Sequence, residues 1–158
     1  PLYRGPAPDI GPILNQDNET GVTIMLIDPD VDHGPILSQE KYNLTGNEFS
    51  KDLGEKLFIR GAEILSEIIP KWINNEIKAT EQNHTLATFT SKITKLDAKI
   101  NLDDNALELW AKYRAYFPWP GLYFFVDNKR IKITKADFMD GKFIIEKIIP
   151  EGGKEIDF

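Results

Sequence analysis

The sequence contains no cysteine and only two histidines among its 158 residues. The absence of cysteine excludes a disulfide framework, a thiol nucleophile and a thiolate metal site. Two histidines are too few for a three-histidine zinc site, and we predict no metal. No apolar run approaches the roughly 20 residues that cross a membrane, so we expect a soluble, cytoplasmic chain with no membrane partner. Glycine-rich phosphate loops and Gly-x-Ser-x-Gly motifs are also missing.

What is present is an ordinary globular composition, with 41% hydrophobic and 28% charged residues and a net charge of −6. The charge is unevenly distributed. Residues 1–80 hold 7 basic and 13 acidic residues, whereas residues 85–135 hold 9 basic and 5 acidic ones. This uneven charge distribution has two interpretations. It indicates either a solvated charged face, or an acidic module joined to a module that binds a polyanion.

The first half of the chain has the pattern of a mixed α/β unit. A loop rich in proline and glycine over residues 1–9 precedes a short helix at about 10–15. Residues 21–28 are β-branched and apolar, which predicts a buried strand, and residues 36–43 predict a second strand. The loop between these strands contains Asp28, Asp30, Asp32 and His33.

A long helix should follow, because Thr45 and Glu48 form a capping-box pattern. We expect it to run to about Ile69, with Pro70 ending it or beginning a second short helical piece. Its apolar face is predicted from residues that recur every three or four positions: Phe49, Leu53, Leu57, Ile64, Leu65 and Ile68.

The second half predicts one helix and a small antiparallel, barrel-like sheet. Asp103 or Asp104 should cap the helix, which ends near Tyr116. Turn signals Asp127-Asn128 and Asp140-Gly141 separate three expected strands at 122–126, 129–136 and 142–149. We therefore divide the chain into a first domain at 1–78, a Thr-rich linker at 79–95 and a second domain at 96–158.

Several segments together resemble a known family. Pro1-x-Tyr3-Arg4-Gly5-x-x-Pro8, Glu19-Thr-Gly-Val-Thr-Ile24 and Asp32-x-Gly34-Pro35-Ile36-Leu37 resemble the second half of a folate-dependent formyltransferase catalytic domain. The segments 92–100 and 113–121 look like the methionyl-tRNA formyltransferases in particular. The resemblance implies an α/β fold: a partial Rossmann-like catalytic domain followed by a small, shortened C-terminal OB-like β-barrel domain.

The resemblance also implies a reaction and its partners. The co-substrate would be 10-formyltetrahydrofolate, and the acceptor would be the amino group of initiator methionyl-tRNA. Asp32 matches the family's catalytic aspartate, where a carboxylate can take a proton or orient an imidazole. Folate contacts would fall on Pro1, Asp28, Asp30 and Val31. Contacts to tRNA would come from a basic set: Lys92, Lys95, Arg114, Lys129, Arg130 and Lys132.

The chain departs from the family in what it lacks. The Rossmann-like half with the family's Asn and His is absent, so we expect an inactive portion of a longer protein. The parent would be a monomer, and the isolated portion could associate through an exposed sheet edge. Two other functions stay open: an amino-sugar formyltransferase on the same fold, and a non-catalytic RNA-binding module.

Four further residues have interpretations independent of the family. His33 and His84 are expected on the surface, His84 within the polar linker. Arg4 is expected to anchor its loop rather than to meet an anion. Trp119, between two prolines, is expected to pack beneath a domain junction rather than to form a ligand platform.

Overall fold

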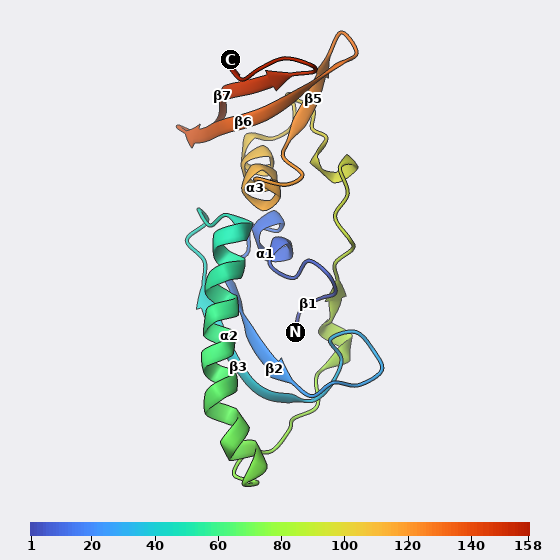
Figure 1. The fold of residues 1–158 in the computed structure, drawn as a ribbon, viewed down its shortest axis with the longest axis vertical. Helices are drawn as coiled ribbons and strands as arrows, with labels where there is room; N and C mark the ends of the chain where they lie inside the picture. The colour runs from blue at the N-terminus through green and yellow to red at the C-terminus, as the bar shows by residue number, and fades with distance from the viewer.

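The computed structural model describes residues 1–158 and places two modules end to end along the long axis (Figure 1). The first module consists of β1 (Tyr3–Arg4), α1 (Ile10–Leu14), β2 (Glu19–Met25), β3 (Ile36–Asn43) and α2 (Ser50–Ile73). Strands β2 and β3 form an antiparallel hairpin, and α2 lies along one face of it. The predicted helix, two strands and long helix of the first half are thus confirmed.

The second module is one helix against one sheet. It consists of α3 (Ala106–Tyr116), β5 (Tyr123–Val126), β6 (Lys129–Met139), β7 (Lys142–Pro150) and β8 (Ile156–Asp157). The strands follow one another in an antiparallel order β5-β6-β7-β8. Because β5 and β8 do not pair, the sheet is open. The α/β class is confirmed, but the closed OB-like barrel is not.

An extended connector joins the modules and is attached to the first one. It contains single turns of 3₁₀ helix at His84–Leu86 and Leu96–Ala98, and between them the short strand β4 (Thr88–Phe89). Strand β4 pairs in parallel with β1, so two segments about 85 residues apart in the sequence form a two-stranded sheet. The polar composition of the predicted linker therefore does not make it a free tether.

The hydrophobic core lies at the junction of the two modules. Ile10 and Ile13 of α1 and Leu53 of α2 belong to the same buried cluster as Leu109 and Tyr113 of α3. Helix α1 packs directly on α3. The two modules therefore share apolar surface that neither would bury alone, and this burial stabilises their arrangement.

Two predicted helix starts are corrected. Thr45 and Glu48 do bond, through Thr45 N–H and Oγ1 to Glu48 Oε1 at 2.8 and 2.7 Å. However, α2 begins only at Ser50, so the pair closes the preceding turn. Helix α3 is capped by Asn105, whose side chain accepts from Leu107 N–H at 2.9 Å, and not by Asp103 or Asp104.

Two other predictions about the first module also differ from the structure. Pro70 does not end α2 but lies inside its last turn. It is tolerated there because the helix ends only three residues later and the proline removes a single backbone hydrogen bond. Strand β2 is half-exposed rather than buried, because α2 covers one face of the hairpin. Ile27, which was predicted within that strand, lies beyond it and is 99% exposed.

No helix of the chain is long and apolar enough to span a membrane.

Candidate active site

Asp32 lies in the loop between β2 and β3. One of its carboxylate oxygens accepts a hydrogen bond from the backbone, and the other has no donor within the chain. Its φ is +52°, in the left-handed region that aspartate tolerates better than most residues. Oδ2 accepts a hydrogen bond from Gly5 N–H at 2.7 Å. Oδ1 accepts none from the chain, and the residue is half-buried. The carboxylate is therefore oriented by the backbone and keeps one oxygen available for a proton or a donor group.

Gln82 of the connector holds this loop in place. Its Nε2 donates to Gly34 O at 2.7 Å and to Asp32 O at 3.0 Å. Its Oε1 accepts from Arg4 Nη2 at 2.7 Å. Gln82 is only 8% exposed, so each of these bonds satisfies a group with little access to water. A residue 50 positions away in the sequence thus fixes the backbone of the candidate catalytic loop.

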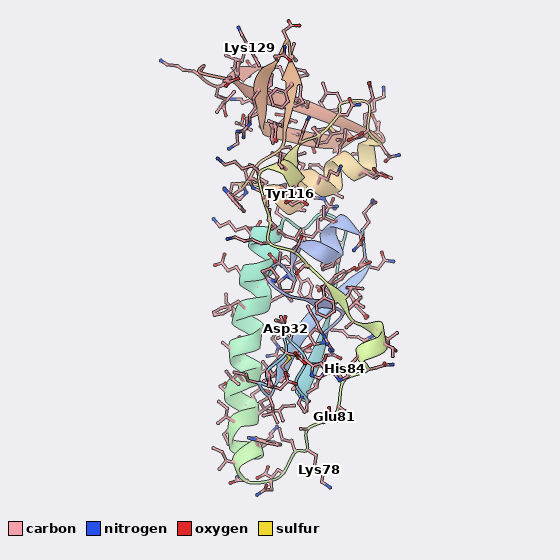
Figure 2. All side chains as sticks on the ribbon, turned by 90° about the vertical axis from the view of Figure 1, so that its right-hand side faces the viewer. Asp32, Lys78, Glu81, His84, Tyr116 and Lys129 are labelled. Carbon is pink, nitrogen blue, oxygen red and sulfur yellow. The ribbon has the colours of Figure 1, made fainter.

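The two histidines meet beside Asp32, one from the loop and one from the connector. The rings of His33 and His84 stack with their centroids 3.8 Å apart and 5° between their planes. Arg4 Nη2 lies 3.0 Å from His84 Nδ1, and because a guanidinium can only donate, Nδ1 must accept. Figure 2 shows His84, which belongs to the connector, near Asp32 of the β2–β3 loop. The predicted exposure of His84 is confirmed, whereas His33 is half-buried rather than fully on the surface; both rings have partners within the chain.

Asp28, rather than Asp32, is the carboxylate that His33 bonds. His33 Nδ1 lies 2.5 Å from Asp28 Oδ2, and since a carboxylate only accepts, the imidazole N–H donates. This hydrogen bond lowers the pKa of Asp28 below its ordinary value. Asp28 Oδ1 also accepts from Asp30 N–H at 3.0 Å, which closes a turn at the start of the loop.

The remaining residues assigned to folate do not share one pocket with Asp32. Asp30 is exposed, and Val31 is 61% exposed. Pro1 lines an open groove of about 400 Å³ between the hairpin and the connector. Gln82 also lines this groove, so it is the residue that connects Pro1's surroundings with the Asp32 loop.

Five of the six predicted basic residues have side chains that form no salt bridge and reach solvent. Lys92 and Lys95 are exposed on the connector, and Lys129 is exposed at the start of β6. Figure 2 shows Lys129 at the end of the second module that faces away from the first. Arg130 and Lys132 are half-buried on the same strand, with Arg130 over the ring of Tyr123 at 4.3 Å.

Two expectations about the second module are corrected. Arg114 is 4% exposed, so it does not belong to this basic surface; helix α3 turns it toward the junction with the first module. Trp119 is 58% exposed, so it does not pack beneath the junction. The buried side chains at the junction come instead from α1, α2 and α3. Arg4, by contrast, anchors its loop as predicted: it is 3% exposed and bonded to Gln82 and His84.

Replacing Gln82 tests whether this residue clamps the Asp32 loop, that is, whether its hydrogen bonds hold the loop in place. In Gln82→Leu, the carbonyl oxygens of Asp32 and Gly34 lose the donor that Gln82 provides, and Arg4 Nη2 keeps only His84 Nδ1, while an apolar side chain of similar size fills the space. We expect the free energy of unfolding to fall by about 2–4 kcal/mol, because each unsatisfied buried group costs about 1–3 kcal/mol. Urea unfolding of the purified chain measures this.

The matched control is Gln39→Leu, which removes an exposed amide bonded to Thr23 Oγ1 and should change the free energy of unfolding by at most about 0.5 kcal/mol. Similar losses from both variants would show that Gln82 is not a clamp.

Comparison with known proteins places the chain in a family. The family model described as "Formyl transferase" matches residues 1–69, and the one described as "Formyl transferase, C-terminal domain" matches residues 92–156. The chain belongs to the formyl transferase family.

Its relatives of known sequence include methionyl-tRNA formyltransferases. That of Chloroflexus aurantiacus is 41% identical over 136 residues, which is 86% of this chain and 44% of the relative. That of Roseiflexus sp. strain RS-1 is 45% identical over 136 residues, 86% of this chain and 42% of the relative. The chain thus spans less than half the length of these curated relatives.

Solved structures with a similar fold have more varied names. WlaRD, a sugar 3N-formyl transferase solved with dTDP and 5-N-formyl-THF, is 30% identical over 88% of this chain and 50% of its own, with a TM-score of 0.71. Methionyl-tRNA formyltransferase from Clostridium thermocellum (18% identity, TM-score 0.68, 99% of this chain and 65% of its own) shows the shared fold. HypX from Aquifex aeolicus in complex with tetrahydrofolic acid also shares the fold. It is 15% identical over 99% of this chain and 32% of its own, with a TM-score of 0.76.

Proposed function

We propose that this chain forms part of a methionyl-tRNA formyltransferase, which transfers a formyl group from 10-formyltetrahydrofolate to the amino group of initiator methionyl-tRNA. The observation that carries the proposal is the 41–45% identity to such enzymes over 136 residues, a stretch long enough to include residues of both modules. The structures solved with folate derivatives support the co-substrate.

In this proposal Asp32 acts on the attacking amine. The amine must lose a proton as it attacks the formyl carbon, and a carboxylate can accept that proton directly, through a water, or by orienting an imidazole. The Gly5 N–H that holds Oδ2 leaves Oδ1 for this purpose. Asp28, Asp30 and Val31 then contact the folate, with Asp28 ionised because the hydrogen bond from His33 lowers its pKa. Pro1, two residues before β1, supplies a further folate contact.

The tRNA would bind along the connector and the second module. Lys92, Lys95, Lys129, Arg130 and Lys132 form no salt bridge within the chain, so their charges are available for phosphates. Neutralising phosphates releases counterions, and binding should therefore weaken steeply as salt is raised. These contacts position the RNA and carry little sequence information.

A second candidate acceptor is an amino sugar attached to a nucleotide. It is favoured by the 30% identity to a sugar 3N-formyl transferase with a TM-score of 0.71. The higher identity to the methionyl-tRNA enzymes argues for tRNA instead.

A hybrid enzyme tests the function. In the Chloroflexus aurantiacus relative, the segment that matches this chain is replaced by this chain, and formyl transfer to methionyl-tRNA is measured with 10-formyltetrahydrofolate. We expect formylmethionyl-tRNA from the hybrid and none from this chain alone. Formylation of a dTDP-amino sugar but not of methionyl-tRNA would favour the second candidate. A folded hybrid that binds tRNA without transferring formyl would indicate a non-catalytic RNA-binding module.

A further inference from the structure

A pocket of about 280 Å³ lies where the two modules meet, away from Asp32. One side is formed by the loop after α1 and by the turn before α2, and the other side by α3 and β6. Ligand pockets commonly occupy such junctions and combine apolar walls with a few polar groups. Its lining includes Asp17, Glu48, Leu107, Trp110, Arg114 and Phe138.

Arg114 lines this pocket as a buried charge without a counter-ion. It is 4% exposed, and no carboxylate oxygen lies within 4.0 Å of its nitrogens. Nη1 donates to Glu48 O at 3.1 Å, while Nε has no partner. Burial lowers the pKa of Arg114, which reflects the cost of holding this charge away from water. Buried arginines are nearly always fully paired, whereas the Nε–H of this guanidinium lacks an acceptor.

The carboxylates in the pocket wall do not supply that acceptor, because neither Asp17 nor Glu48 lies within salt-bridge distance of Arg114 and each accepts hydrogen bonds from other groups. Asp17 accepts from the Tyr3 hydroxyl at 2.5 Å. The Glu48 carboxylate accepts from Thr45 N–H and from Gly46 N–H at 2.8 and 3.1 Å. A ligand must therefore bring the acceptor. The two existing negative charges disfavour a dianion, which points to an acceptor with a single charge.

The rest of the pocket wall fits an apolar group. Trp110 and Phe138 are half-buried and stack with their centroids 6.2 Å apart and 17° between their planes. Leu107, one turn before Trp110 on α3, is half-exposed at the rim. A flat carboxylate matches the planar fork of a guanidinium, and an attached apolar group would lie against these side chains.

We propose that this junction pocket binds a small monocarboxylate, with its carboxylate hydrogen-bonded to Arg114 and its apolar part against Trp110 and Phe138. Such a ligand would touch both modules at once. It would therefore stabilise their arrangement, and the stabilisation would rise with the logarithm of its concentration once that concentration exceeds the dissociation constant.

Binding of benzoate to the purified full chain tests this proposal, with benzamide as its neutral counterpart and inorganic phosphate as the multivalent anion. Two-dimensional ¹H–¹⁵N NMR follows the Arg114 Nε–H and the Trp110 indole N–H. We expect saturable shifts with benzoate, binding at least about tenfold weaker for benzamide, and weaker binding for phosphate.

Three variants complete the test. Arg114→Gln removes the charge, and Leu107→Trp fills the pocket from its exposed rim; both should abolish benzoate binding. Arg130→Gln is the matched control, since Arg130 also has an unpartnered buried Nε but lies outside the pocket, and it should bind normally. If Arg114→Gln does not fold, Leu107→Trp decides. Absence of saturable binding, equal binding of benzamide or phosphate, or binding retained in either pocket variant would overturn the proposal.

Discussion

Asp32→Asn should lower formyl transfer by the hybrid enzyme about 10³-fold, within the range that proton transfer by a positioned side chain contributes. Asparagine has the same shape and tolerates the positive φ at this position. Its amide oxygen can still accept from Gly5 N–H, so the loop should keep its structure. Only the basic carboxylate is lost. Single-turnover formylation of methionyl-tRNA measures the effect.

Asp140→Asn is the matched control for this substitution. Asp140 also has a positive φ, of +51°, but lies in the exposed turn between β6 and β7. The control should keep the full rate, and both variants should keep the stability of the unmodified hybrid. If Asp32→Asn retained most of the activity, Asp32 would have no acid–base or orienting role, although the family assignment would stand.

Gly34→Ala should destabilise the chain by about 3 kcal/mol or more, which is a large effect for one methyl group. A Cβ at Gly34 would lie 1.9 Å from Leu26 O and 2.9 Å from Leu26 C. These are backbone atoms held by the bond from Leu26 N–H to Pro35 O at 2.9 Å, so they cannot move aside as a flexible side chain would. The loop that carries Asp32 would have to open. Urea unfolding measures the loss.

Gly141→Ala separates this clash from the general cost of replacing glycine. Gly141 has a φ of +74°, and a Cβ there would meet nothing within 4 Å. We expect a loss of only about 1 kcal/mol from backbone strain. Equal losses at the two positions would contradict the close approach at Gly34. In the hybrid enzyme, Gly34→Ala should also lower formyl transfer, because Gly34 O is one of the two carbonyl groups that Gln82 holds.

Local patterns predicted most of the secondary structure because they depend on neighbours in the chain. Strand β3 has the predicted ends at Ile36 and Asn43, and the Asp140-Gly141 turn joins two strands as expected. The errors lie at helix ends and in burial. Thr45 and Glu48 form their bonds in a turn rather than at a helix start. A capping pattern specifies which groups bond locally, but not which following residue first becomes helical.

The candidate site was only partly accessible from the sequence. Asp32 stood out through the resemblance, and the structure shows how its carboxylate is held. Gln82 gave no signal, because a glutamine in a polar, threonine-rich stretch is typical of a solvated linker. Its role depends on the pairing of β4 with β1, which brings the connector against the Asp32 loop. Arg114 was assigned to a basic surface from its charge and from the family resemblance, whereas its place on α3 buries it.

The sequence by itself determined the family, the order of helices and strands, and the identity of the catalytic candidate, because motifs and periodicity are properties of short segments. Only the tertiary structure decided that the sheet of the second module stays open, that the connector clamps the Asp32 loop, and that Arg114 faces a pocket between the modules. Each of these depends on contacts between residues far apart in the chain. Such contacts are selected by the burial of apolar surface and by the pairing of polar groups across the whole molecule, which no local pattern records.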